Sequence, residues 1–253
     1  MTGPENALSI INISGLMMSG KEDGLDAALR THLKGAEIHT VGPTPRSSFR
    51  RDPQAAVELA MAAIRERFSH TSGQPPRQQI LVGRSYGGVI ALQAYMQDRG
   101  EHSIDRVFCI EAPVNPSVEV RPPRLLPPLR LFKRYYDERP KSIGEALASG
   151  NGRVAGVVTI GHATDAIVPP TAMSLPKSHN IEITKRADTE TLRTGLNGEA
   201  KRSLHVELSG ELDTPNHTGL ITSTLPEAYN RHLFWTPEKY EAICAIIAEL
   251  ARR

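Results

Sequence analysis

Short apolar runs alternate with longer amphipathic stretches along this chain. The apolar runs are rich in β-branched residues, which favours strands buried on both faces of a parallel sheet. The expected strands cover residues 7–13, 37–41, 79–82, 106–110, 154–160 and 204–208. Between them, apolar residues recur at helical spacing, and the expected helices cover residues 23–33, 52–68, 87–99 and 237–250. The alternation predicts an α/β fold, a mostly parallel sheet with helices on both faces.

Two stretches break the alternation. Residues 113–141 are rich in proline and follow an expected strand almost directly, whereas residues 184–202 are polar, charged and without a period. Both are expected to be long excursions from the sheet. The chain of 253 residues is expected to form a single domain, residues 1–253, with an insertion at about 113–150.

Composition and charge argue against several classes of protein. Lysine and arginine total 30 against 28 acidic residues, and a net charge of +2 argues against a strongly basic nucleic-acid binder. No apolar run approaches the ~18 residues of a membrane-spanning helix, and no secretory signal is visible. Cys109 and Cys244 fall in expected buried elements, which fits a reducing, cytoplasmic location. No spacing of histidine and cysteine suits zinc, so neither a metal nor a cofactor is expected.

Residues 83–87, Gly-Arg-Ser-Tyr-Gly, match the pattern G-x-S-x-G. The pattern follows the apolar run 79–82 and precedes an expected helix, which is the strand–turn–helix context of a nucleophilic serine. Glycine suits both ends of such a turn because side chains at Gly83 or Gly87 would collide with neighbouring elements. Ser85 is therefore the candidate nucleophile, held near a helix N-terminus whose dipole favours developing negative charge.

A serine hydroxyl becomes nucleophilic when a base removes its proton and a carboxylate orients that base. Asp165 follows the expected strand 154–160, and so belongs to the carboxyl edge of the sheet, where α/β active sites assemble. Of the nine histidines, His217 lies on the loop after the last expected strand and can reach back to the serine. His162, beside Asp165, is the alternative base.

These residues resemble the α/β-hydrolase superfamily over nearly the whole chain. The resemblance rests on residues 83–88, on G-x-x-x-D-x-x-V-P at 161–169 and on Asn-His-Thr-Gly-Leu at 216–220. It implies Ser85 as nucleophile, Asp165 as acid and His217 as base. It also implies an oxyanion hole formed by the N–H groups of Leu16 and Tyr86.

Three features of the sequence depart from the family's common pattern. Ser14-Gly15 stands where the superfamily commonly has His-Gly, so Met17 is an alternative to Leu16 in the oxyanion hole and a candidate for the substrate site. Arg84 replaces a frequent histidine before the nucleophile, which indicates a different polarity of the pocket. The first expected strand begins at residue 7, so the two leading antiparallel strands common in the superfamily are not expected. The resemblance therefore implies a compact version of the fold.

By the same resemblance, the insertion at about 113–150 takes the place of a lid. Pro127 and Pro128 can open a short helix there, after which Leu129, Phe132 and Tyr136 share an apolar face. That face suits an acyl substrate, so we expect a serine esterase or lipase-like enzyme that cleaves carboxylic esters. Thioesterase or acyltransferase chemistry uses the same triad. The simpler alternative is that the insertion only covers a sheet edge.

The insertion is also basic. Residues 121–141 hold seven cations and two acids, a local charge of +5. A solvated basic loop is the plain interpretation. The other is contact with an anionic substrate group or, weakly, with an anionic lipid surface.

Two further classes remain as alternatives. Residues 15–21 match all but the last position of the nucleotide-binding pattern G-x-x-x-x-G-K-[ST], and the expected strand 106–110 ends next to Glu111. Glu22, however, stands where Mg²⁺ needs a hydroxyl group, and its carboxylate would repel a triphosphate. The remaining alternative is a catalytically silent hydrolase fold that binds a ligand.

Overall fold

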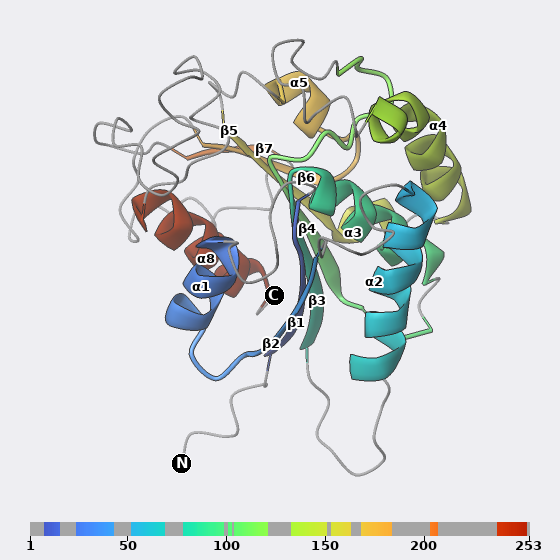
Figure 1. Cartoon of the computed structure of the whole chain (residues 1–253). Coiled ribbons are helices and arrows are strands. Elements are labelled where there is room, and N and C mark those ends of the chain that lie inside the picture. The colour runs from blue at the N-terminus through green and yellow to red at the C-terminus, as the bar shows by residue number, and fades with distance from the viewer. Residues whose placement is uncertain are drawn as a thin grey trace, which may run out of the picture.

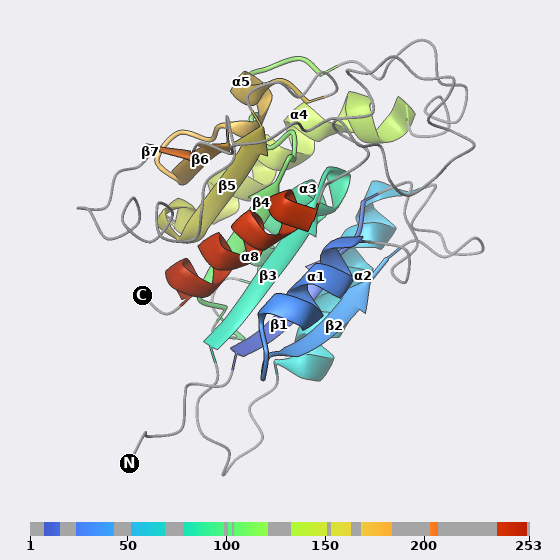
Figure 2. The same ribbon diagram turned by 90° about the vertical axis from the view of Figure 1, so that its left-hand side faces the viewer.

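Seven strands form one sheet in the computed structural model, and every pairing between them is parallel (Figures 1 and 2). The structure describes residues 8–15, 24–42, 52–68, 78–98, 101–102, 104–120, 133–150, 153–162, 168–183, 203–206 and 237–251. The strand order is β2-β1-β3-β4-β5-β6-β7. The strands are β1 Leu8–Ile13, β2 Glu37–Val41, β3 Gln78–Arg84, β4 Arg106–Ile110, β5 Val157–His162, β6 His179–Ile183 and β7 Ser203–Val206. The predicted α/β fold with a parallel sheet is confirmed.

Helices cover both faces of this sheet. α1 and α8 lie together on one face, whereas α2, α3 and α4 lie on the other (Figures 1 and 2). The helices are α1 Gly24–His32, α2 Pro53–Arg67, α3 Tyr86–Gln97, α4 Lys133–Ser149, α5 Pro170–Met173 and α8 Pro237–Ala251. At the start of α2, the Asp52 carboxylate accepts a hydrogen bond from the Gln54 N–H and Pro53 takes the first helical position, which favours a helix start at this place.

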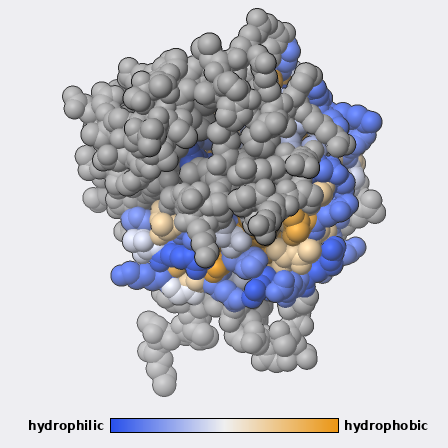
Figure 3. All heavy atoms as spheres, viewed as in Figure 1, coloured by the Kyte–Doolittle hydropathy of each residue, from blue (hydrophilic) through white to orange (hydrophobic). Residues whose placement is uncertain are grey.

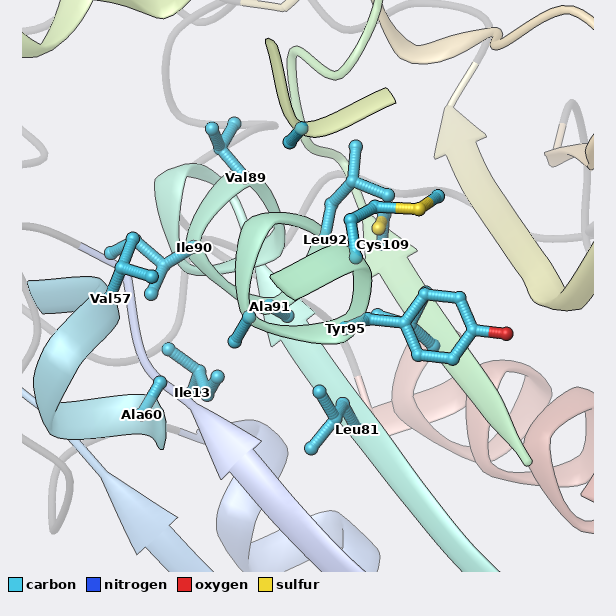
Figure 4. Packing of buried hydrophobic residues seen from close by; sticks show 14 of the residues in the cluster. Ile13, Val57, Ala60, Leu81, Val89, Ile90, Ala91, Leu92, Tyr95 and Cys109 are labelled. Carbon is cyan, nitrogen blue, oxygen red and sulfur yellow. The ribbon is translucent and has the colours of Figure 1, made fainter. Parts of the chain in front are cut away.

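The central strands β1, β3 and β4 are buried on both faces, which explains their apolar runs. Successive side chains of a strand alternate between faces, so Ile11 and Ile13 pack under α2 and α3 while Ile10 packs under α1 and α8. Figure 4 shows the first of these clusters, in which Ile90 of α3 lies beside Val57 of α2 and Leu92 of α3 lies beside Cys109 of β4. Burial of this kind fixes the carboxyl ends of β1, β3 and β4 relative to the start of α3.

The structure differs from the expected elements in two places, at the start of β5 and at β6, which was not expected. β5 begins at Val157 instead of residue 154, because Arg153–Gly156 form a 3₁₀ turn. The Arg153 guanidinium donates to the carbonyls of Tyr95 and Ile104 and lies 4.1 Å from the centre of the Tyr95 ring, which holds that turn. The sequence reading also missed β6, a strand in which polar residues interrupt the apolar ones.

The proline-rich insertion contains a longer helix than expected. Residues 121–132, with Pro127, Pro128, Leu129 and Phe132, lie outside the described residues, but α4 runs from Lys133 to Ser149 with Pro140 inside it. Arg139 anchors the helix. It is 1% exposed and donates to the backbone carbonyls of three residues that follow β4: Pro113, Asn115 and Val118. Arg139 therefore does not contribute to a basic surface of the insertion.

Large apolar side chains of the described residues are mostly covered. On the face seen in Figure 3 the described side chains are largely hydrophilic, with one group of hydrophobic ones at the lower right. Leu59 of α2, 41% exposed, is the large apolar side chain that the described part of the chain leaves open to solvent. A single exposed leucine is ordinary for a globular protein. No helix in the described ranges has the length and apolar character needed to cross a bilayer.

Candidate active site

Ser85 stands on the turn between β3 and α3. Its φ is 53° and its ψ is −130°, a conformation that residues other than glycine rarely adopt. Two backbone hydrogen bonds fix it: the Ser85 N–H donates to the Ile110 carbonyl of β4 at 2.8 Å, and the Gly88 N–H donates to the Ser85 carbonyl at 3.0 Å. Because a strained residue persists only where its surroundings over-determine it, this turn is a candidate for function.

The glycines around Ser85 are required by close backbone contacts. A Cβ atom at Gly87 would lie 2.2 Å from the Ile13 carbonyl oxygen, and one at Gly83 would lie 2.4 Å from the Gly87 carbonyl oxygen. At Gly88 it would lie 2.5 Å from the Cβ of Ala112. Backbone atoms cannot move aside as a flexible side chain can, so α3 approaches β1 and β3 closely only because these positions lack a side chain.

We therefore expect Gly87→Ala to destabilise the protein by about 3 kcal/mol or more, as overpacking against backbone does. For a chain of this size the melting temperature should fall by about 10 °C. Gly144→Ala is the matched control, because a Cβ at Gly144 in α4 meets nothing within 4 Å. It should leave the melting temperature unchanged or raise it slightly. Equal melting temperatures for the two variants would contradict the close contact at Gly87.

The end of β1 lies directly beside Ser85. Ile13 of β1 pairs with Gly83 of β3, and a Cβ at Gly15 would lie 3.4 Å from the Ser85 Cβ and 3.9 Å from its Oγ. The chain that leaves β1 therefore begins next to the serine hydroxyl. Leu16 and Met17, the predicted oxyanion and substrate residues of that segment, lie outside the described residues.

A serine in a left-handed turn between a central strand and the next helix, on a helix-covered parallel sheet, is the arrangement described for one fold. The fold is that of an α/β hydrolase. The Ser85 N–H donates to the Ile110 carbonyl, and the next backbone N–H belongs to Tyr86, at the first position of α3, where helix N–H groups have no partner within the helix.

Tyr86 also connects the turn of the α/β-hydrolase fold to the insertion. Its hydroxyl donates to the Tyr135 carbonyl of α4, and its ring packs edge-on against Tyr135 at 4.8 Å between centroids. The centroid of the Tyr136 ring lies 6.1 Å from that of Tyr86. Burial raises the pKa of Tyr86 well above its usual range and that of Tyr136 to about 12, so both phenols are neutral at physiological pH. Tyr136, a predicted substrate residue, is partly buried beside the start of α3.

The other two predicted catalytic residues, Asp165 and His217, lie outside the described residues. β5 ends at His162, whose Cα pairs with Ile183, so Asp165 follows the carboxyl end of this strand. Since β4 alone separates β5 from β3, the ends of β5 and β3 are roughly 10 Å apart. A side chain from a loop after β5 can cover part of that distance.

The sequence reading missed a buried ion pair behind the serine. Arg84, the last residue of β3, has its Nε 3.8 Å from Oε2 of Glu111, the first residue after β4. The two side chains are 4% and 2% exposed. The predicted change of pocket polarity at Arg84 is thus accompanied by a buried acid. The signal in the sequence was a charged residue at the end of each of two apolar runs.

In the part of the chain that the structure describes, no group of histidine, cysteine, aspartate and glutamate residues could hold a metal ion. Cys109 of β4 is buried and reduced, and burial raises the pKa of its thiol far above the usual range. Its Sγ lies 3.4 Å from the Gly88 carbonyl, so Cys109 packs beneath α3 as a small apolar residue.

No family model matches the chain, nor does any curated protein. Among solved structures it is similar to an esterase of Pyrobaculum calidifontis, with 19% identity and a TM-score of 0.49 over 98% of this chain and 78% of that one. It is also similar to carboxyl esterase 2 of Tuber melanosporum, with 19% identity and a TM-score of 0.46 over 65% of this chain and 61% of that one. The type II thioesterase YbtT of yersiniabactin biosynthesis is 11% identical, with a TM-score of 0.43 over 72% and 87%. Identities this low say nothing about a substrate.

Proposed function

We propose that the chain is a serine hydrolase that cleaves carboxylic esters through an acyl-enzyme intermediate. The left-handed turn at Ser85 carries this proposal, because it places a hydroxyl at the carboxyl edge of the sheet and at the start of α3. The close approach of Gly15 to Ser85 supports it, since a second backbone segment borders the hydroxyl there.

The proposed reaction uses three side chains in two half-reactions. His217 removes the proton of Ser85 Oγ as this oxygen attacks the ester carbonyl carbon, and the same proton then leaves with the alcohol. Water next attacks the acyl-enzyme and gives a proton to His217, which passes it to Ser85 Oγ as the bond to the acyl group breaks and the carboxylic acid leaves. Asp165 orients the imidazole and stabilises its charged form. The N–H groups of Tyr86 and of Leu16, with Met17 as the alternative, stabilise the oxyanion.

The apolar side of the substrate site is proposed to come from the insertion. Tyr136 is the described member of the set, and it packs against Tyr86 next to the serine turn. Leu129, Phe132 and Met17 complete the proposed contacts with an acyl chain. An apolar wall of this kind favours esters whose acyl group can be buried.

A panel of p-nitrophenyl esters from acetate to palmitate tests the proposal. We expect turnover of at least part of the series, with kcat/KM rising to a maximum at the acyl length that fills the apolar site. A matched series of thioesters distinguishes thioesterase activity, and an added alcohol that increases turnover distinguishes acyl transfer to that alcohol. No turnover of any ester or thioester, together with no reaction of Ser85 with a fluorophosphonate, would refute a serine hydrolase.

A further inference from the structure

The ion pair between Arg84 and Glu111 joins the ends of two neighbouring strands, and each end carries a residue with a positive φ. Ser85, with φ of 53°, follows Arg84 at the end of β3, and Glu111, with φ of 47°, follows Ile110 at the end of β4. Of the described residues other than glycine, only these two and Lys177 have a positive φ. Each of two neighbouring strands is therefore followed directly by a residue with a positive φ, and the last residues of the two strands, Arg84 and Ile110, are partners in the register.

Hydrogen bonds join these two turns to the strands beside them. Arg84 pairs with Ile110 in the register of β3 and β4, and the Ser85 N–H donates to the Ile110 carbonyl. The Glu111 N–H in turn donates to the Ile160 carbonyl of β5 at 2.7 Å. A change in the backbone at Glu111 would therefore move the carbonyl that fixes the Ser85 N–H.

Burial of the two charged side chains makes the ion pair between them hard to separate. The side chains are 4% and 2% exposed, and Arg84 shares its face of β3 with the buried residues Ile80 and Val82. A charge buried to this extent is costly to separate from its partner. The ion pair thus resists any motion that would rotate either turn.

We propose that Arg84 and Glu111 are positioning residues that hold Ser85 in its left-handed conformation and so aim its hydroxyl at the substrate. The inference rests on the proposed role of Ser85 as nucleophile. Arg84 acts through the peptide bond that joins it to Ser85, and Glu111 acts through the Ile110 carbonyl, which accepts the Ser85 N–H. The pair places Ser85 Oγ within the narrow geometry that attack requires, and a displacement of 1 Å in such a group costs about 100-fold in rate.

A second buried ion pair offers a matched control. Arg153 Nη1 lies 3.4 Å from Asp98 Oδ2, and the Asp98 side chain is fully buried. Asp98 follows the C-terminal end of α3, which by helix geometry is about 18 Å from Ser85. Its loss should lower stability without moving the serine.

The test measures the second-order rate constant for fluorophosphonate labelling of Ser85, beside the melting temperature of each variant. The variants are Glu111→Gln, Arg84→Met, the double variant and Asp98→Asn, all compared well below the lowest melting temperature. We expect labelling to slow by ~10- to 100-fold in each single variant and to recover in part in the double variant, where both charges of the pair are removed together. Asp98→Asn should melt earlier yet label at the wild-type rate. Arg84→Lys, which keeps the charge but loses the guanidinium, should lie between wild type and Arg84→Met and replaces the latter if that variant does not fold.

Labelling at the wild-type rate in folded Glu111→Gln and Arg84→Lys would overturn the inference and leave the pair a stabilising one. Equal slowing in Asp98→Asn would overturn it as well, because the effect would then follow general loss of stability. If the wild-type protein itself does not label at Ser85, the proposed function fails first, and the positioning role falls with it.

Discussion

Ser85→Ala is expected to abolish covalent labelling by a fluorophosphonate and to lower kcat for ester hydrolysis by ~10⁴-fold or more. In the proposed mechanism this hydroxyl forms the acyl-enzyme, and no other residue replaces it. The Ser85 side chain makes no capping hydrogen bond to α3, so the loss of Oγ should not disturb the start of the helix. The melting temperature of Ser85→Ala should therefore stay close to that of the wild type.

A second serine serves as the control for this experiment. Ser174 is exposed after the short helix α5, and Ser174→Ala should label and turn over substrate as the wild type does. Intact-protein mass spectrometry gives the number of attached groups and peptide mapping gives their position. Labelling that persists in Ser85→Ala would mean that another residue is the nucleophile, and the proposed triad would be wrong.

His217→Ala is expected to be about as damaging as Ser85→Ala, because the serine then has no base. In the wild-type protein, kcat/KM should rise with pH through an apparent pKa near ~7, since only the neutral imidazole can accept the serine proton. Activity is therefore lost as the pH falls below that value, and this limb of the profile should be absent in His217→Ala. The measurement is kcat/KM of a neutral ester from pH 5 to 9.

His162→Ala is the control that separates the two candidate bases. His162 ends β5, next to the segment of Asp165, and it is the alternative that the sequence leaves open. The variant should keep most of the activity and the same dependence on pH. A large loss in His162→Ala with little loss in His217→Ala would reassign the base to His162.

The strands that the sequence predicts well are those with continuous apolar runs. β1 and β4 fall within one residue of the expected ranges, because burial on both faces leaves a signal that does not depend on neighbours. β2 also matches its expected range, although as an edge strand it is only partly buried. β6 lacks that signal, since His179, Asn180 and Glu182 alternate with two isoleucines over a short segment. The expected start of β5 was wrong because Arg153 begins a 3₁₀ turn there. Its guanidinium donates to the carbonyls of Tyr95 and Ile104, which are distant in sequence.

The helix α4 and the Arg84–Glu111 pair show a second limit. The stretch 113–141 was expected to be an excursion from the sheet, yet α4 runs through Pro140, held by the contacts of Arg139 with carbonyls after β4. The serine turn itself was predictable, because strand, glycines and helix are adjacent along the chain. The partner of Arg84 was not, because the register of β3 and β4 alone brings Glu111 to it.

The contact between Tyr86 and α4 has a consequence for protein engineering. Loops over an α/β-hydrolase core are attractive units to exchange when a new substrate is wanted. Here the residue after Ser85 donates a hydrogen bond to the Tyr135 carbonyl, and Arg139 fastens the same helix to the chain that leaves β4. A graft that replaced residues 113–150 alone would leave the Tyr86 hydroxyl buried without an acceptor, directly beside the serine turn. The smallest exchangeable unit of this chain therefore includes position 86 together with the insertion.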